Sequence, residues 1–368
     1  MGDTVSRGES HMKKFLAVSA GVVVSAFLFV PIMEVADRND YNLLSTDPAT
    51  GLYRYRPNSS FKTAGDCYTN TVEINNLGFH GLPVEPEKGK DVFRIVVTGS
   101  SYASAIQVPV QEMYSTLLQD KLNADSRKGY TYEVIPIALG QNRTLLDMFY
   151  YLKYGAALDP DLVITIESDY ELVTQNAIDT PVFDAQGDIV LETPKSGESA
   201  AVAFIRGVSR HSKFLVNLYN RSLVFKSSLQ SFLSDPFSSV VVPVSSGDSP
   251  KTEDAAQEER TRWEMKEKIL NAYAGYVVRD GARFVFASWT GLQVATSTAE
   301  ELPRHMKDIS VRNNFYYADL VPVSRAEEAS SGKAGRYPCD YHWNADGNRY
   351  IADALYAYLS ARPALLSR

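Results

Sequence analysis

The chain has 368 residues, of which 45% are apolar and 22% charged, and a formal net charge of −7 at pH 7. These values are typical of a globular protein with one large domain or two small ones. The acidic balance argues against a nucleic-acid-binding protein, because no basic stripe is available to neutralise phosphates.

The first feature along the chain is an uncharged stretch, Phe15 to Met33. Its 19 residues are just enough to cross a bilayer core as a helix. Lys13 and Lys14 precede the stretch and acidic residues follow it. The positive-inside rule then places residues 1–14, a short stub or tag, in the cytoplasm and the rest on the periplasmic or extracellular side. We therefore expect a single-pass membrane anchor at 15–33, with a cleaved signal peptide as the alternative.

The regular part of the fold is expected from residue 91 to residue 368. Residues 34–90 are rich in Asn, Pro, Gly and Tyr and indicate an extended lead-in with turns. After them, short apolar runs alternate with helical periodicity, which predicts an α/β fold with a parallel sheet covered by helices on both faces. An insertion at about 172–257 interrupts this order. Strands are expected at 93–98, 132–139, 161–168 and 282–288, and helices after Pro109, at 145–158, around 263–277 and at 351–359.

Small and polar residues follow the predicted strands directly. Ser101 comes after the first strand, Gly140 and Asn142 after the second, and Ser168 ends the third. In an open parallel sheet, ligands bind beyond the carboxyl ends of the strands. We therefore expect these residues at one rim, with the loop before the last helix folding back over it.

That loop contains Asp340 and His342. A serine becomes a good nucleophile when a histidine takes its proton, and a carboxylate then orients the histidine. Asp340 and His342 are two residues apart, so on an extended loop their side chains can point to the same side. Ser101 precedes a helix, whose first amides favour a developing negative charge. Ser101, His342 and Asp340 are thus predicted as nucleophile, base and orienting acid, with a turn serine and a helix-capping histidine as the alternatives.

Five segments together resemble the SGNH (GDSL-type) hydrolase superfamily, in particular its membrane-anchored bacterial members. They are INNLGFHG (74–81), FRIVVTGSSYASAIQVP (93–109), ALGQN (138–142), DPDLVITIESD (159–169) and DYHWNADGNRYIA (340–352). The resemblance implies a flavodoxin-like three-layer α/β/α sandwich that hydrolyses or transfers acyl groups, often acetyl groups on glycans or lipids, without a metal or cofactor. It also implies that the amides of Ser101 and Gly140 bind the oxyanion.

Some positions depart from the family pattern. Ser100 stands where the family usually has aspartate, and Ser168 stands where it usually has asparagine. Ser168 and Asn142 are therefore the two candidates for a further oxyanion donor. The D-x-H-W order of the last block resembles that of alginate acetylation proteins. Three functions stay open: an ester hydrolase acting on an envelope glycan or lipid, an acyltransferase that decorates an exported polysaccharide, and a non-catalytic glycan-binding protein.

The two cysteines, Cys67 and Cys339, form no metal-binding pattern. Outside the cytoplasm, a pair of cysteines often forms a disulfide. A bridge here would tie the lead-in to the loop of Asp340 and His342. Two free thiols are the alternative.

Overall fold

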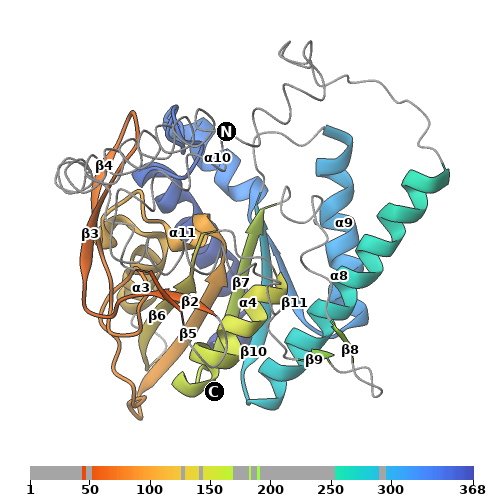
Figure 1. Cartoon of the computed structure of the whole chain (residues 1–368), viewed down its shortest axis with the longest axis horizontal. Coiled ribbons are helices and arrows are strands. Elements are labelled where there is room, and N and C mark those ends of the chain that lie inside the picture. Colours follow the sequence, from red (N-terminus) through yellow and green to blue (C-terminus); the bar gives the residue numbers. More distant parts are fainter. Residues whose placement is uncertain are drawn as a thin grey trace, which may run out of the picture. The chain divides into compact units, whose positions relative to one another are not determined.

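The central element of the fold is a five-stranded parallel sheet with the order β11-β10-β7-β5-β6 (Figure 1). If these five strands are numbered in the order in which they occur along the chain, their arrangement in the sheet is that of flavodoxin-like doubly wound folds. The direction in which successive strands are added reverses between β5 and β7. The parallel α/β sheet predicted from the sequence is confirmed. The strands are β5 (Val92–Gly99), β6 (Thr131–Ala138), β7 (Leu162–Ser168), β10 (Arg283–Trp289) and β11 (Tyr316–Asp319).

The computed structural model describes residues 44–46, 52–125, 129–140, 144–168, 182–183, 189–190, 253–289 and 296–368. These residues all belong to one of the chain's two compact units, formed by Leu44–Pro194 and Pro243–Arg368. The predicted anchor at 15–33 lies outside the described residues and stays a prediction. Among the described residues, no helix combines the length and apolar character that crossing a bilayer requires.

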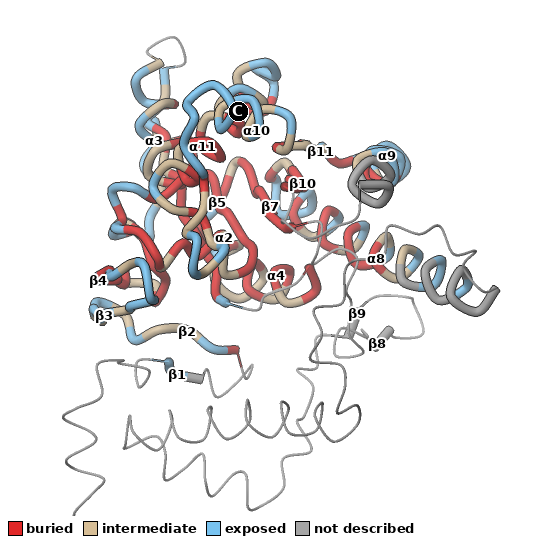
Figure 2. Tube along the Cα trace, turned by 90° about the horizontal axis from the view of Figure 1, so that it is seen from above, coloured by how far each residue is buried: buried red, intermediate tan, exposed pale blue. Residues whose placement is uncertain are grey.

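Helices cover both faces of the sheet, as Figure 2 shows from above. Along β5, Val96 points into one apolar cluster, while Ile95 and Val97 point into the other. This double burial explains why the strand sequence is continuously apolar rather than alternating.

The first cluster is completed by α4 (Thr144–Tyr150) with its continuations η3 (Tyr151–Gly155) and η4 (Ala156–Leu158), by α8 (Glu253–Arg279) and by α9 (Thr296–Arg312). The second is completed by α3 (Tyr114–Ala124), α11 (Ala345–Ser360), against which α10 (Val321–Ser331) packs, and η6 (Pro363–Leu366).

The helix predicted after Pro109 is divided into two. A short turn, η2 (Val110–Glu112), is followed by Met113 in an extended conformation, with φ −67° and ψ 142°. The new start at Tyr114 is stabilised from another helix, because the Tyr114 amide donates to Oδ1 of Asn348 at 3.0 Å. The apolar residues keep helical spacing through Met113, and for that reason the sequence predicted a single helix. That prediction was wrong.

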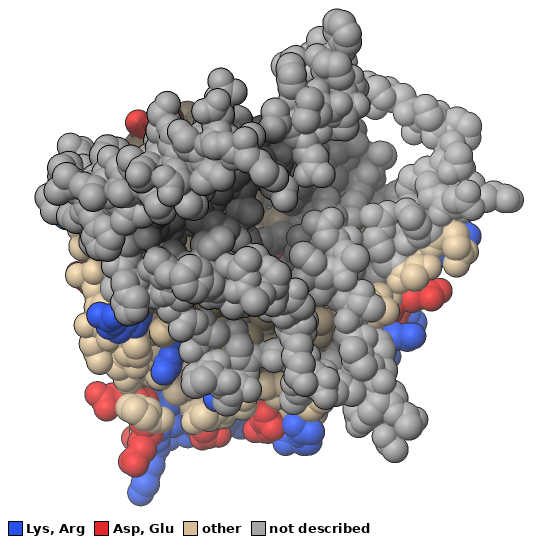
Figure 3. Space-filling view, in the orientation of Figure 1, with Lys and Arg blue, Asp and Glu red and all other residues tan. Residues whose placement is uncertain are grey.

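Short antiparallel strand pairs lie outside the main sheet. In the lead-in, β1 (Leu44–Thr46) pairs with β2 (Tyr53–Tyr55), and β3 (Ser60–Ala64) pairs with β4 (Thr69–Glu73) as a hairpin. In the predicted insertion, β8 (Val182–Phe183) pairs with β9 (Ile189–Val190). On the face seen in Figure 3, the described basic and acidic side chains are mixed along one edge.

Candidate active site

The turn after β5 places Ser101 at the point where the strand order reverses. β5 ends at Gly99, and α2 (Ser101–Ser104) begins two residues later. Gly99 has φ +154°, and a Cβ added there would lie 2.5 Å from the carbonyl oxygen of Ile166 and 2.7 Å from the Cβ of Ala103. Only glycine allows this close passage beside β7. Ser101 therefore lies at the topological position where doubly wound sheets bind their ligands.

Ser101, His342 and Asp340 form a continuous hydrogen-bonded chain. Oγ of Ser101 lies 2.9 Å from Nε2 of His342, although the two residues are 241 positions apart in the sequence. Nδ1 of His342 donates to Oδ1 of Asp340 at 2.7 Å. With the proton held on Nδ1, the lone pair of Nε2 faces the serine hydroxyl, which is the arrangement that proton transfer requires. The structure thus brings together the three predicted residues; their catalytic roles stay predictions.

The segment that carries Asp340 and His342 is a tight turn, not the extended loop expected from the sequence. Tyr341 between them has φ +53°, in the left-handed region. The His342 amide donates to the Asp340 carbonyl at 2.6 Å, and the amides of Tyr337 and Tyr341 donate to the carbonyls of His342 and Tyr337 at 3.0 and 3.1 Å. A bulky side chain in this region costs about 1–2 kcal/mol. The turn bends back on itself so that the carboxylate of Asp340 reaches Nδ1.

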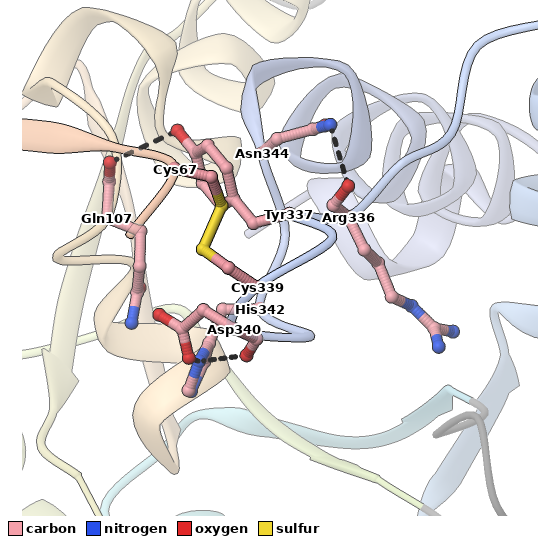
Figure 4. The surroundings of a disulfide bond; sticks show 8 residues. All are labelled: Cys67, Gln107, Arg336, Tyr337, Cys339, Asp340, His342 and Asn344. Carbon is pink, nitrogen blue, oxygen red and sulfur yellow. Dashed lines mark hydrogen bonds and ion pairs between the residues drawn. A yellow bond between two sulfur atoms is a disulfide. The ribbon is translucent and has the colours of Figure 1, made fainter. Parts of the chain in front are cut away.

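A disulfide joins this turn to the β3–β4 hairpin (Figure 4). Cys67 lies between the two hairpin strands, and Cys339 immediately precedes Asp340, with their Cα atoms 5.9 Å apart. The same segment is also attached to the chain beyond α2, because the Tyr337 hydroxyl donates to the Gln107 carbonyl at 3.3 Å. Of the two alternatives left open by the sequence, the structure contains the bridge.

Aromatic rings surround the predicted base. The Tyr102 ring centroid lies 4.6 Å from that of His342, 4.3 Å from that of Trp289 and 5.3 Å from that of Trp343. These three aromatic residues were not among the predicted site residues. Tyr102 and Trp343 directly follow the predicted nucleophile and base, so their positions in the sequence were a usable signal. Nothing in the sequence indicated that Trp289, at the end of β10, meets the same loop.

The predicted oxyanion donors lie on neighbouring strands. The Ser101 amide is the first of α2 and has no acceptor within that helix. Gly99 is in register with Ala138 on β6 and Ile166 on β7. Gly140 and Ser168 each lie two residues beyond these partners, at the same rim. Asn142 lies outside the described residues.

The two serines that depart from the family pattern are both buried. Ser168 has 2% of its surface exposed and Ser100 has 1%. The Ser100 hydroxyl has no hydrogen-bond partner among the described residues, and it does not cap α2. Ser100 therefore takes no part in the chain that links Ser101 to Asp340.

His80 supports the other end of α2. Its Nδ1 donates to the Ser104 carbonyl at 3.1 Å, and Nε2 has no hydrogen-bond partner among the described residues. Burial lowers the pKa of His80 to about 4, because a protonated ring would carry its charge in a site that is shielded from water. The neutral ring thus fixes the helix that begins with Ser101.

A buried ion pair lies directly behind Ser168. Nζ of Lys266 lies 2.6 Å from Oε2 of Glu167, which precedes Ser168 on β7, and the Thr144 hydroxyl contacts both charged groups. Lys266 and Glu167 are almost completely shielded from solvent. In the part of the chain that the structure describes, no group of His, Cys, Asp and Glu side chains is arranged to hold a metal ion.

Comparisons with known proteins give only a remote similarity. No family model matches the sequence, and no curated protein matches it. Among solved structures, the chain is similar to an acetyl xylan esterase (14% identity, 73% of this chain and 100% of that chain, TM-score 0.40). It is also similar to the esterase EstA from Pseudoalteromonas sp. (12%, 74% and 98%, 0.40) and to a GDSL-like lipase from Parabacteroides merdae (11%, 74% and 96%, 0.39). The function proposed below rests on the geometry of the site.

Proposed function

We propose that this protein is a serine ester hydrolase of the SGNH type, with Ser101 as the nucleophile. The hydrogen-bonded chain from Ser101 through His342 to Asp340 is the observation that supports this proposal. Such a chain is what makes a serine hydroxyl nucleophilic at neutral pH. Its position at the strand reversal gives a substrate access from beyond the sheet.

In the first half of the reaction, Oγ of Ser101 attacks the ester carbonyl while Nε2 of His342 takes the hydroxyl proton. The carbonyl oxygen becomes an oxyanion, which the amides of Ser101 and Gly140 stabilise, with Ser168 and Asn142 as further candidate donors. The bond to the alcohol oxygen breaks, and that oxygen receives the proton from His342. The acyl group remains on Ser101.

In the second half, a water molecule gives a proton to His342 and attacks the acyl-serine. The acid is released, and Ser101 recovers its proton from His342. If the hydroxyl of a glycan attacks in place of water, the same residues transfer the acyl group to that glycan.

The substrates we propose are acyl esters, in particular acetyl esters, of a glycan or lipid of the cell envelope. The Cys67–Cys339 disulfide supports a catalytic domain outside the cytoplasm, since disulfides persist in oxidising compartments. This location agrees with the membrane anchor proposed for residues 15–33.

A fluorophosphonate probe tests the proposal, because it reacts only with an activated serine. The full-length protein in detergent should be labelled, and Ser101→Ala and His342→Ala should abolish the labelling. Matched controls are Ser100→Ala, which removes the neighbouring unpartnered hydroxyl, and His305→Ala, which removes an exposed histidine stacked on Trp263. Labelling that survives Ser101→Ala, or a complete lack of labelling in the folded wild type, would contradict the proposal.

Small-ester hydrolysis by the same variants then measures turnover. Adding a soluble glycan separates the two outcomes of the second step: transfer gives acylated glycan, and hydrolysis gives free acid.

A further inference from the structure

The β3–β4 hairpin is attached to both halves of the candidate active site. Cys67 is bonded to Cys339, at the start of the turn that carries the predicted base (Figure 4). Asn70, on β4, reaches the segment that follows α2, because its Nδ2 donates to the carbonyls of Ile106 and Val108 at 2.9 and 2.7 Å. One hairpin residue thus holds the side of the base, and another holds the side of the nucleophile.

The side chain of Asn70 is buried and both of its amide hydrogens are used. Only 6% of its surface is exposed, although the residues on either side of it are exposed. A side-chain amide has two hydrogens, and each of them meets one carbonyl here. Gln107 lies between the two acceptors, and its own carbonyl accepts from the Tyr337 hydroxyl at 3.3 Å. Three consecutive carbonyls are therefore held by side chains, and moving the segment would leave buried acceptors without donors, which is unfavourable.

A chain of hydrogen bonds leads from this segment to the nucleophile. The Val108 amide donates to the Ala105 carbonyl at 3.2 Å, and the Ala105 amide donates to the Ser101 carbonyl at 3.1 Å. Ala105 ends α2 in the left-handed region, with φ +46°, a conformation that costs alanine free energy. A helix of four residues has little stability of its own, so its position depends on such outside contacts. A shift at Val108 is therefore transmitted to Ser101.

Side-chain packing joins the same three parts of the chain. The Tyr68 ring of the hairpin lies against the Tyr337 ring of the turn, with centroids 4.8 Å apart. Tyr337 and Leu82 also pack against a small apolar cluster that contains Ala105 and Val108. This cluster is separate from the two large clusters on the faces of the sheet. The sheet can therefore remain folded when contacts in this unit are removed.

We propose that the β3–β4 hairpin is a clamp that sets the distance between Ser101 and His342. Asn70 is its positioning residue on the nucleophile side, and Cys67 is its attachment on the base side. Proton transfer requires Oγ of Ser101 to stay within hydrogen-bond reach of Nε2 of His342, which is 2.9 Å away. This role rests on the proposed function and adds to it a residue that does not touch the substrate.

Removing the Asn70 amide tests the clamp on the full-length protein in detergent. Asn70→Leu keeps a similar branched shape and removes both donors. Asn70→Ser, which leaves room for water in place of the amide, replaces it if that variant does not fold. We expect the maximal rate of fluorophosphonate labelling to fall about 10- to 100-fold. The probe concentration that gives half of this rate should not change, because Asn70 does not contact the probe.

Asn123→Leu is the matched control. Asn123 also exchanges two hydrogen bonds with the backbone, at Tyr132 near the beginning of β6 and away from the rim that carries Ser101. This variant should lower Tm without slowing the labelling of the folded protein. A loss of labelling rate in Asn123→Leu equal to that in Asn70→Leu would reduce the effect of Asn70 to general destabilisation and overturn the clamp.

The two attachments of the hairpin should depend on each other. In Cys67→Ser/Cys339→Ser the hairpin no longer connects the two halves of the site, so adding Asn70→Leu should slow labelling by less than about threefold. The same fold-decrease with and without the bridge would mean that the two effects are independent, and it would overturn the clamp.

Histidine ring resonances measure the clamp without a reaction. Nitrogen-15 labelling of the five histidines reports whether Nε2 of His342 accepts from Ser101, and Ser101→Ala gives the reference for loss of that hydrogen bond. We expect Asn70→Leu to shift the Nε2 resonance toward its position in Ser101→Ala, while the Nδ1 proton stays bound to Asp340.

The failure of the clamp can be distinguished from the failure of the esterase proposal. If the wild type is labelled, an unchanged labelling rate or an unchanged Nε2 resonance in Asn70→Leu overturns the clamp and leaves the esterase proposal intact. If the folded wild type is not labelled, the esterase proposal fails, and the shift of the Nε2 resonance decides the clamp: a shifted resonance supports it and an unchanged one overturns it.

Discussion

The disulfide should contribute both to stability and to the geometry of the site, and the double variant Cys67→Ser/Cys339→Ser tests both effects. The bridge closes a loop with a sequence separation of 272 residues. For a loop of this length, the chain-entropy relation gives about 5–6 kcal/mol at 25 °C as an upper bound. A loss of that size would lower Tm by roughly 10–20 °C. Both cysteines are exposed, so serine creates no buried polar group.

The effect on the site should be visible well below Tm. Without the bridge, the segment that begins at Cys339 loses its covalent attachment to the hairpin, and the Asp340–His342 pair is held less firmly over Ser101. Misplacement of a catalytic group by about 1 Å can cost roughly 10²-fold in rate. We expect the rate of fluorophosphonate labelling at 25 °C to fall about 10- to 100-fold in the double variant.

Scanning calorimetry and labelling kinetics measure the two effects on the same samples. A reductant should reproduce both losses in the wild type and change nothing in the double variant, which separates loss of the bridge from loss of the cysteine side chains. A double variant with the Tm and labelling rate of the wild type would refute the reasoning.

Three further predictions concern other parts of the site. Asp340→Asn should lower the labelling rate by about 10⁴-fold, the loss seen when this exchange is made in a serine protease triad, and a near-normal rate would exclude an orienting role. Between pH 6.5 and about 4, the unfolded chain binds a proton at His80 that the folded chain does not, so stability should fall by roughly 3 kcal/mol as the pH decreases through this window. Urea titrations at pH 7 and 4.5 should show a smaller fall for His80→Gln, and equal falls would contradict the burial effect. Lys266→Met should destabilise by about 3–5 kcal/mol, because it leaves the Glu167 carboxylate buried without its partner, and adding Glu167→Gln should restore most of the loss in urea unfolding.

Four strands of the sheet were predictable because each of them is an apolar run that is followed directly by small or polar residues. These runs identified β5, β6, β7 and β10 to within one residue at each end, and with them the rim that carries Ser101. β11 was missed because it is a four-residue edge strand whose sequence, YYAD, has no period of its own. It becomes a strand through its pairing with β10, and such pairing cannot be seen in the local sequence.

The candidate site was predictable in its residues but not in its backbone. Asp340 and His342 were chosen for their chemistry and spacing, and a spacing of two is compatible with several loop conformations. A left-handed tyrosine is a rare conformation that no local preference predicts. Trp289 and its contacts depend on where the end of β10 meets the C-terminal loop, which is a property of the packed molecule.

The strained turn persists because the chain on both sides of it is fixed. On one side, the disulfide at Cys339 holds it to the hairpin. On the other side, Asn344 caps α11 by accepting from the Gly347 amide at 2.9 Å, while its own amide group donates to the carbonyls of Ala334 and Arg336 at 2.8 and 3.2 Å. With both ends fixed, the segment between them has little freedom to relax, and the strain at Tyr341 is maintained. The same restraints therefore hold the Asp340 carboxylate against Nδ1 of His342 and aim Nε2 at Ser101, so the proposed proton transfer depends on one rigid turn.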